Sequence, residues 1–337
     1  MRVLLDNHNQ DAKHIPVLLK TILENIKPKG TWIDGTFGAG GYSRSLLESG
    51  VDKVFAIDRD PLALKNSRSL QEDFQERFTF LLGQFSEIEN LINNSKNCLT
   101  NCNGIVFDLG VSSMQLDEAS RGFSFKRDGP LDMRMGDSTL SAADIINFYD
   151  EKNIADILFQ YGEEKFSRII AKKIVAARPI GSTLELANVI ENCFASYSQT
   201  KIHPATKSFQ ALRIAVNDEL VELVKGLRVA ERLLEPGGQL VVVTFHSLED
   251  RIVKRFVRSR TDRRGNSNRH APSSGEVDPS FRLRKVKPYL VKSDEKKQNP
   301  RSRSAKLRIA IRTEALPHQN QKEKLGLPKL AFESLVS

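Results

Sequence analysis

Residues 31–60 read TWIDGTFGAGGYSRSLLESGVDKVFAIDRD, and this stretch decides the fold of the chain. The order of its apolar, glycine and helix-forming residues predicts a strand, a glycine-rich turn, a helix and a second strand. An acid closes each strand, Asp34 the first and Asp58 the second. A unit of this kind predicts an open, Rossmann-like α/β sheet, whose ligands bind where the strands end. The predicted elements are strand 31–33, helix 43–49 and strand 54–57.

The turn between these strands has the features of a nucleoside-cofactor site. Gly38, Gly40 and Gly41 lack Cβ atoms, so backbone N–H groups of the turn can approach a ligand closely. Asp58 lies about twenty residues beyond the turn, where an acid accepts hydrogen bonds from ribose hydroxyls. The spacing G-x-G-G departs from the G-x-G-x-x-G of dinucleotide sites, and the Asp34 carboxylate would repel a pyrophosphate. Because that carboxylate suits a ligand with a cationic amine, we expect S-adenosylmethionine rather than NAD.

Two further strands are predicted, over 78–82 and 104–108. Asp108 closes the later one, which lies next to the first strand in a doubly wound sheet, so Asp108 would face the cofactor and the reacting centre. Phe85 follows the earlier one and either lies against an adenine ring or belongs to the core, and its spacing does not separate these interpretations. Acids at three successive strand ends strengthen the prediction of a ligand site.

The α/β pattern stops after residue 113 and resumes after residue 206. Between these positions the chain has glycine-rich loops and helical periodicity without a clear strand, which predicts a helical insertion that covers the site and grips a substrate. The predicted domains are a discontinuous core of residues 1–113 and 207–313, an insertion of residues 114–206 and a flexible tail of residues 314–337. In residues 114–313 the predicted helices are 142–156, 163–177, 184–194, 209–234 and 247–257. The predicted strands of these residues are 239–244 and, at the sheet edge, 305–311.

The formal net charge of the 337-residue chain is +9, and it is unevenly distributed. Residues 251–312 hold about twenty Lys and Arg residues against about five acids. A basic region attached to a near-neutral fold is typical of proteins that bind a polyanion, most often nucleic acid. Within this region, residues 258–275 and 292–303 are rich in Ser, Asn and Arg and predict mobile basic loops.

The chain shows no signal of a membrane-bound or secreted protein. No apolar run approaches the length of about eighteen residues that a membrane span needs, and residues 1–13 lack the apolar core of a signal peptide. Cys98, Cys102 and Cys193 cannot make a full set of disulfides and have no zinc partners at finger spacing. We therefore expect a cytoplasmic protein with free thiols and no metal.

Sequence motifs along nearly the whole chain are similar to those of one known family. They are HIPVL from His14, DGTFGAGGYSR from Asp34, AIDRDP from Ala56, DLGVSSMQLD from Asp108, RGFSF from Arg121, GPLDMRM from Gly129, YGEEKFSRIIAKKIV from Tyr161, HPATKSFQALRIAVNDEL from His203, GGQLVVVTFHSLEDRIVK from Gly237 and RSRSAKLR from Arg301. In this order they resemble the MraW/RsmH family, the bacterial small-subunit ribosomal RNA cytosine-N4 methyltransferases. A generic S-adenosylmethionine fold would match only the first three.

The resemblance implies a class I methyltransferase core, α/β and Rossmann-like, with a helical substrate domain inserted after the fourth strand. It also implies methyl transfer from S-adenosylmethionine to the exocyclic amine of one cytidine in the ribosomal decoding region. The implied partners are the small ribosomal subunit and its RNA, and the sequence leaves a homodimer open. The family commonly has His where this chain has Tyr42. The expected cofactor residues, from the turn and the resemblance together, are Asp34, Gly38, Gly40, Gly41, Tyr42, Asp58, Phe85, Asp108 and Gln115.

The reaction needs acceptors for the hydrogens of the target amine. The lone pair of cytosine N4 is delocalised into the ring, so the enzyme must pyramidalise the amine and take up proton density. Many amino methyltransferases use an (Asp/Asn)-Pro-Pro-aromatic loop after the fourth strand, whereas this chain has Asp108-Leu109-Gly110. The catalytic candidates are Asp108 and, from the neighbouring strand end, His246, Ser247 and Glu249. Ser247 could instead cap the following helix together with Asp250.

Two alternative functions stay open at this stage. The same fold could methylate an amine of DNA or protein, although the absent Pro-Pro loop argues weakly against DNA. The chain could also be a ribosome-assembly factor that binds RNA and has a degenerate cofactor site, against which stand the intact acids at three strand ends. An NAD enzyme is a more distant third.

Overall fold

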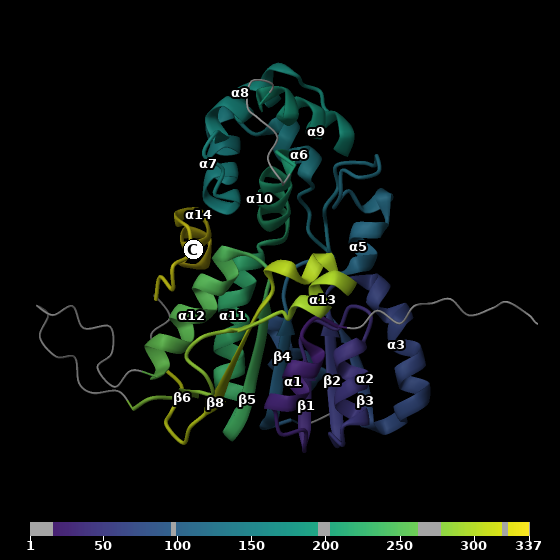
Figure 1. Ribbon diagram of the computed structural model, residues 1–337, viewed down its shortest axis with the longest axis vertical. Helices are drawn as coiled ribbons and strands as arrows, with labels where there is room; N and C mark the ends of the chain where they lie inside the picture. The colour runs from purple at the N-terminus through teal and green to yellow at the C-terminus, as the bar shows by residue number, and fades with distance from the viewer. Residues whose placement is uncertain (1–15, 96–98, 195–202, 262–277, 319–322, 337) are drawn as a thin grey trace, which may run out of the picture.

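The computed structural model describes residues 16–95, 99–194, 203–261, 278–318 and 323–336. Within these residues one mixed sheet has the strand order β3-β2-β1-β4-β5-β8-β6, with β7 paired to β8 (Figure 1). Strands β1 to β5 are parallel, and β8 is antiparallel to β5. This architecture confirms the predicted class I, Rossmann-like α/β core. The strands are β1 Thr31–Asp34, β2 Lys53–Asp58, β3 Phe78–Leu82, β4 Cys102–Asp108, β5 Leu234–Thr244, β6 Phe281–Leu283, β7 Tyr289–Leu290 and β8 Lys306–Arg312.

The sheet is buried on both faces because successive residues of its strands pack into different cores. Trp32 and Val54 face a layer formed by α1, α2 and α3, whereas Ile33 and Phe55 face α4, α11 and α12. All four side chains are almost completely buried. The helices of the two layers are α1 Leu19–Asn25, α2 Gly41–Glu48, α3 Pro61–Phe74, α4 Ile88–Asn94, α11 Glu219–Leu233 and α12 Ser247–Thr261.

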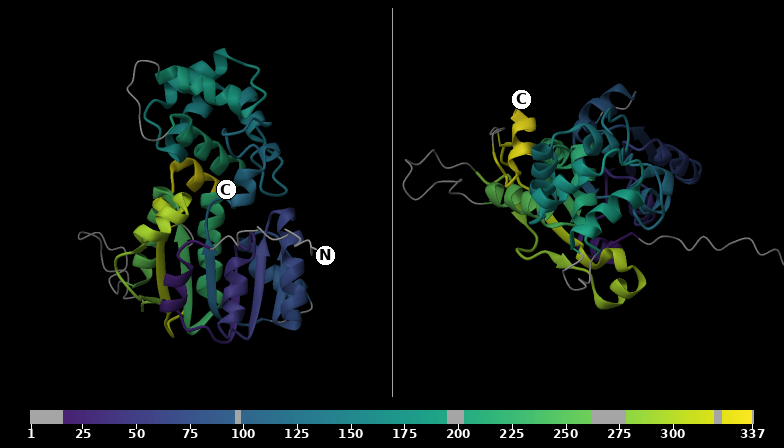
Figure 2. Two further views of the ribbon diagram at one scale, coloured as in Figure 1. Left: turned by 45° about the vertical axis from the view of Figure 1, so that its right-hand side comes forward. Right: turned by 90° about the horizontal axis from the view of Figure 1, so that it is seen from above.

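A separate helical layer stands above the carboxyl ends of the parallel strands (Figures 1 and 2). Helix α7 packs against both α8 and α10, which makes these three helices one packed unit. In the described part of residues 114–206, the strand pairing found is an isolated bridge between Pro130 and Ser182. The insertion boundaries at residues 114 and 206 stay a proposal. The helices of this layer are α6 Ala142–Phe148, α7 Glu151–Gly162, α8 Ser167–Ala176, α9 Thr183–Glu191 and α10 Ala205–Asn217.

Two helices predicted from apolar periodicity are each broken in two. In the segment 142–156, one helix ends at Phe148 and α7 begins after Asp150. The Asp150 side chain accepts a hydrogen bond from the Asn153 N–H. The segment 209–234 is interrupted at Asp218, which has a left-handed φ of 48° and separates α10 from α11. The predictions were wrong because the apolar pattern continues across both breaks.

The basic region contains more regular structure than the sequence predicted. Residues 292–303 were expected to form a mobile loop, but they contain α13 Ser293–Gln298 and the 3-10 helix η5 Pro300–Ser304. The Glu295 carboxylate anchors this segment by accepting a hydrogen bond of 2.6 Å from the Leu18 N–H. The last strand is not at the edge, because β8 pairs with β5 on one side and with β6 and β7 on the other. Of the other predicted loop, residues 258–261 belong to α12, and the rest lies outside the described residues.

The C-terminal segment also differs from the predicted flexible tail. Helix α14, Lys329–Val336, packs against α11 and α7. The Leu330 N–H donates a hydrogen bond of 3.0 Å to the Gln160 side chain, and Leu325 and Ala331 are buried. These apolar contacts tie residues 323–336 to both layers. Of the described helices, none combines the length and apolar character that crossing a lipid bilayer requires.

Candidate active site

The glycine-rich turn lies between β1 and α2 and is held by Asp58 at the end of β2. The Asp58 carboxylate accepts hydrogen bonds from the Gly38 N–H (2.7 Å) and the Asp60 N–H (2.9 Å). Gly40 has a φ of 80°, and a Cβ atom there would stand 2.7 Å from the Phe37 ring. Glycine is therefore required at this position. The acid expected to bind ribose thus also shapes the turn.

A cavity of about 350 Å³ opens along the carboxyl ends of the parallel strands, within the size range of small-molecule sites. It extends from the glycine-rich turn past Asp108, at the end of β4, to Phe245 and Glu249 after β5. Phe85 lines it and packs against Phe107 with ring centroids 4.9 Å apart, so this side chain belongs both to the core and to the cavity wall. The expected cofactor residues that line the cavity are Gly38, Gly41, Tyr42, Asp58, Phe85, Asp108 and Gln115.

Two expected cofactor residues, Asp34 and Gly40, do not line the cavity. Asp34 is fully buried behind the turn, where its carboxylate accepts hydrogen bonds from the Thr36 N–H (3.2 Å) and the Ser43 hydroxyl (2.7 Å). Burial raises the pKa of Asp34 to about 6, although these two hydrogen bonds lower it. The side chain expected to meet the ligand is therefore turned inward, and it can act on a bound cation only through its charge.

Tyr42 and Gln115 line the cavity, but their polar atoms bond within the protein. The Tyr42 hydroxyl donates to the Val17 carbonyl, so this side chain anchors the chain just before α1. The Gln115 amide donates to Asp60 (2.7 Å) and accepts from the Ser112 N–H (2.9 Å). Both side chains fix the walls of the cavity.

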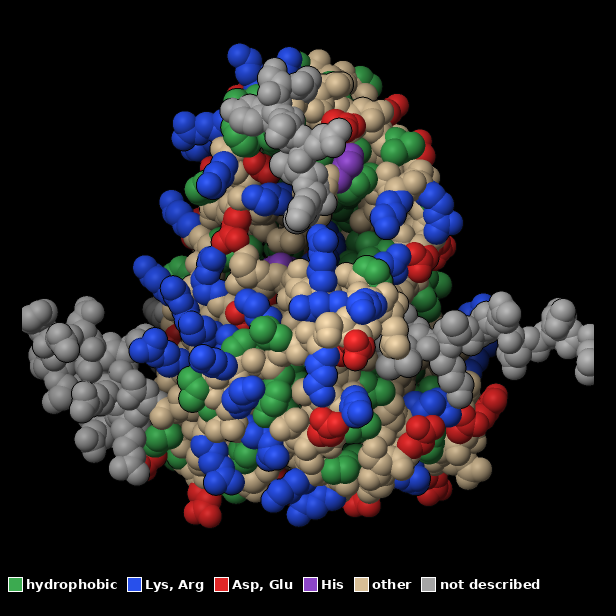
Figure 3. Space-filling view, viewed as in Figure 1, with side chains coloured by type: hydrophobic (Ala, Val, Ile, Leu, Met, Phe, Trp, Pro, Cys, Tyr) green, Lys and Arg blue, Asp and Glu red, His purple; other side chains and the backbone are tan. Residues whose placement is uncertain are grey.

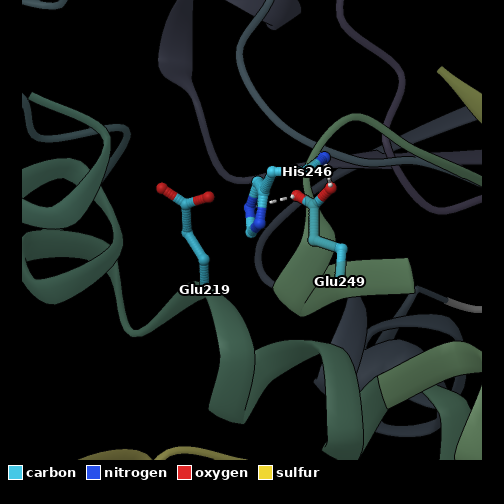
Figure 4. A group of neighbouring side chains, drawn as sticks. All are labelled: Glu219, His246 and Glu249. Atoms are coloured by element: carbon cyan, nitrogen blue, oxygen red, sulfur yellow. Dashed lines mark hydrogen bonds and ion pairs between the residues drawn. The ribbon is translucent and has the colours of Figure 1, made fainter. Parts of the chain in front are cut away.

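At the far end of the cavity, which we call the acceptor end, Asp108 lies near Glu249. One Glu249 oxygen, Oε2, accepts hydrogen bonds from the backbone N–H groups of Phe245 (2.7 Å) and His246 (3.2 Å). The other, Oε1, lies 3.0 Å from His246 Nε2 (Figure 4). Asp108 Oδ1 is buried and has no hydrogen-bond partner among the described residues. A buried, unpaired carboxylate oxygen in a cavity wall is available to a ligand.

The two carboxylates of the acceptor end differ in acidity. Burial raises the pKa of Asp108 well above its usual range, and the charges of Asp34 and Glu249 raise it further. Burial would also raise the pKa of Glu249, but its interactions with His246 and Arg213 and the hydrogen bond from the Phe245 N–H together outweigh burial and lower this pKa. The acceptor end therefore holds one carboxyl group that readily takes a proton and one that stays ionised.

The position of Ser247 argues against a catalytic role. Its side chain is exposed, lies outside the cavity lining and donates a hydrogen bond of 2.5 Å to Glu163 at the end of α7. Glu163 also pairs with Arg251 at 2.6 Å. Ser247 is the first residue of α12, but its side chain bonds to the helical layer instead of forming the expected cap with Asp250. It thus links the two layers.

Residues 11–313 match the family model described as the MraW methylase family. The chain belongs to this family. Three similar proteins, each named "Ribosomal RNA small subunit methyltransferase H", come from Roseobacter denitrificans (53% identical, over 94% of this chain and 95% of that protein), Jannaschia sp. (52%, over 95% and 97%) and Parvibaculum lavamentivorans (50%, over 92% and 92%). A solved rRNA methylase from Streptococcus thermophilus aligns at a TM-score of 0.40 and 11% identity over 88% of this chain and 94% of that one, too distantly to carry an argument.

As a member of the MraW methylase family, the chain uses S-adenosylmethionine as its methyl donor. The cavity fits this molecule in its chemistry. The Asp58 carboxylate stands beside the glycine-rich turn, Phe85 offers an aromatic face, and the unpaired Asp108 oxygen suits a positively charged sulfonium. All three features lie along one continuous wall.

Glu219, His246 and Glu249 have ligand atoms within 4.8 Å of one another, which is a spacing that a metal ion could use (Figure 4). Arg213, however, binds both carboxylate oxygens of Glu219 at 2.7 Å each. Glu249 is likewise held by two backbone N–H groups. These contacts engage both oxygens of Glu219 and Oε2 of Glu249 within the chain. The two ring nitrogens of His246 are buried and have no hydrogen-bond partner among the described residues, although Nε2 lies 3.0 Å from Glu249 Oε1.

The sequence analysis missed three parts of this site. Phe245 directly follows β5, so the strand-end rule that selected its neighbours could have found it. Arg213 and Glu219 form an ion pair across the break between α10 and α11, and no sequence pattern predicted this break. Asn299 and Arg301 reach the cavity from η5, and nothing in their local sequence indicates this position.

Proposed function

We propose that this protein transfers a methyl group from S-adenosylmethionine to the N4 amine of a cytidine in the decoding region of small-subunit ribosomal RNA. The single observation that carries the reaction is the pair of carboxylates, Asp108 and Glu249, at the acceptor end of the cofactor cavity. The names of relatives that match nearly the whole chain support the ribosomal substrate. The choice of cytidine and of the decoding region rests on the family resemblance. A ribosomal substrate places the enzyme in the cytoplasm.

The cofactor half of the cavity binds and orients the methyl donor. Asp58 accepts hydrogen bonds from the ribose hydroxyls with the lone pairs that the Gly38 and Asp60 N–H groups leave free. Phe85 lies against the adenine ring. Bound S-adenosylmethionine supplies an electrophilic methyl group on a positively charged sulfur. Asp108 stands where the two halves of the cavity meet and stabilises that charge.

The acceptor end orients the target amine for methyl transfer. Asp108 and Glu249 are both hydrogen-bond acceptors, so together they can hold the two N–H groups of the amine and turn its lone pair toward the methyl group. As the nitrogen–carbon bond forms and the carbon–sulfur bond breaks, the amine acquires a surplus proton. Asp108 accepts this proton because its pKa is raised by burial. The lowered pKa of Glu249 keeps this carboxylate ionised, so that it stays an acceptor throughout.

The molecular surface around the cavity supports an RNA substrate. Lys and Arg side chains gather over α13 and α12, below the hollow between the sheet and the helical layer (Figure 3). Such a surface holds the phosphate backbone, while the target base unstacks to enter the cavity. Arg301 belongs to this surface and also lines the cavity mouth. The exposed basic residues in and beside α12, α13, η5 and α8 are Lys254, Arg255, Arg258, Lys292, Lys296, Lys297, Arg301, Arg303, Lys165, Arg168, Lys172 and Lys173.

Ligand binding and product analysis together test this proposal against its alternatives. S-adenosylmethionine should raise the melting temperature and NAD should not, because only a ligand of the native site stabilises the fold. Digestion of RNA methylated by the enzyme should then yield N4-methylcytidine. An assembly factor with a degenerate site would show no response to S-adenosylmethionine. Methylated protein, DNA or adenosine would keep the fold and contradict the proposed acceptor.

A further inference from the structure

The acceptor end lacks the aromatic loop that many amino methyltransferases place after the fourth strand. A target base needs a flat apolar surface there, because stacking fixes the plane in which its amine lies. In this chain the loop after Asp108 reads Leu109-Gly110 and contains no ring. Another part of the cavity wall must therefore supply the surface.

Four aromatic side chains of the described residues line the cavity. Phe37 packs against two other phenylalanines beside the glycine-rich turn and is almost fully buried. Tyr42 is buried and bonded to Val17, and Phe85 packs against the core at the cofactor end. Phe245 is the remaining ring; it also packs against the core, but it alone of the four lies within one helical turn of Glu249 in the chain.

Phe245 lies beside Glu249 and across from the loop that follows Asp108. It directly follows β5, the neighbour of β4, and its N–H donates a hydrogen bond of 2.7 Å to Glu249. Its side chain is half-buried, and none of the described aromatic rings pairs with it. Gly110 stands opposite: a Cβ atom there would lie 3.6 Å from the Phe245 ring, so a longer side chain would cover the ring. The φ of 98° at Gly110 also disfavours any such side chain.

We propose that Phe245 is the stacking surface for the target cytosine and that Gly110 keeps its face open. This inference rests on the proposed function and deepens it. The ring binds the unstacked base in one plane, so that the exocyclic amine points between Asp108 and Glu249. Phe245 is thus a positioning residue that contacts the substrate and exchanges no proton. The neighbouring strand end replaces the missing loop aromatic.

The test compares Phe245→Leu with Phe245→Tyr. Leucine keeps the apolar bulk but removes the aromatic face, whereas tyrosine keeps the face. At saturating S-adenosylmethionine, F245L should lose about 5- to 150-fold in the single-turnover rate of methyl transfer to RNA, the range expected for one base stacked on an aromatic ring. F245Y should recover this rate to within about threefold, and both should bind S-adenosylmethionine within about twofold of wild type by calorimetry.

Phe85→Leu is the matched control, because it changes the same residue type at the cofactor end. F85L should weaken S-adenosylmethionine binding and regain most of its transfer rate at saturating cofactor, the reverse of F245L. An unchanged rate in F245L, equal losses in F245L and F245Y, or a parallel loss of cofactor affinity in F245L would each overturn the stacking role. If the wild-type enzyme methylates no RNA, the proposed function fails first and the inference fails with it.

Discussion

Lowering the pH from 7 to 5 is expected to weaken the binding of S-adenosylmethionine much more than that of S-adenosylhomocysteine. Burial raises the pKa of three acids, Asp34, Asp58 and Asp108, that stand at or behind the cavity wall. The two ligands differ by one methyl group and by the positive charge on sulfur. Their other ionisable groups are the same, so the ratio of their dissociation constants isolates the interaction between the sulfonium and these acids.

The magnitude follows from the pKa of Asp34, which is about 6. A bound cation favours the ionised form of the Asp34 carboxyl group. Below pH 6 this group is mostly protonated in the free enzyme, so binding of S-adenosylmethionine must release its proton and becomes weaker. Above pH 6 the group is mostly ionised already, and the affinity changes little. If the complex keeps Asp34 ionised, the affinity ratio changes about tenfold between pH 7 and 5, or about 1.4 kcal/mol. The Coulomb energy is of the required order, because unit charges about 10 Å apart interact by about 1.7 kcal/mol at an effective dielectric constant of about 20, which corresponds to a change of about sixfold in the affinity ratio between these two pH values.

Isothermal titration calorimetry of both ligands at the two pH values measures this ratio. Asp34→Asn is the matched variant, since its amide oxygen can still accept from the Thr36 N–H while the charge is lost. The variant should flatten the pH dependence of the ratio, and its melting temperature shows whether the turn has kept its fold. An affinity ratio that is the same at pH 5 and pH 7 in the wild-type enzyme would refute the electrostatic reasoning.

Three further substitutions test separate parts of the structure. Glu249→Gln should slow methyl transfer about 100-fold at saturating cofactor, because an amide is a poorer acceptor, while calorimetry should show unchanged cofactor binding. Ser247→Ala should change the transfer rate less than about twofold, since its recorded side-chain hydrogen bond is to the helical layer; a large loss would restore it as a catalytic candidate. Arg260→Met should lower the free energy of unfolding by about 3–5 kcal/mol in urea titrations, because it leaves Glu231 (2.6 Å) and Glu323 (2.8 Å) without their buried cation; a change below about 1 kcal/mol would contradict this.

Those parts of the site that follow from strand-end rules could be predicted from the sequence. Asp58 and Asp108 follow strands whose burial on both faces produces continuous apolar runs, so both the strands and their ends are visible. The same rule misplaced Asp34, because it specifies the position of a residue but not the direction of its side chain. In the structure the Thr36 N–H and the Ser43 hydroxyl turn that carboxylate inward.

The remaining differences come from long-range contacts that local patterns do not encode. Asp218 breaks a helix although its neighbours have helical periodicity, because the chain must turn from the helical layer into α11. Residues 292–303 have a loop-like composition, but Glu295 bonds to Leu18 and Arg301 pairs with Asp117 at 2.6 Å, and these contacts fix short helices. Tertiary contacts therefore outweighed intrinsic propensity in both cases.

The proposed acceptor is tested most directly by labelled methyl transfer from S-adenosylmethionine to small ribosomal subunits, naked ribosomal RNA and duplex DNA, with ribosomal material from cells that lack this gene. The labelled atom would be mapped, and Asp58→Ala would serve as the cofactor-site control. We expect label on N4 of one decoding-region cytidine, and its loss in the variant. Label on DNA or protein, or tight RNA binding without any transfer, would contradict the proposed function.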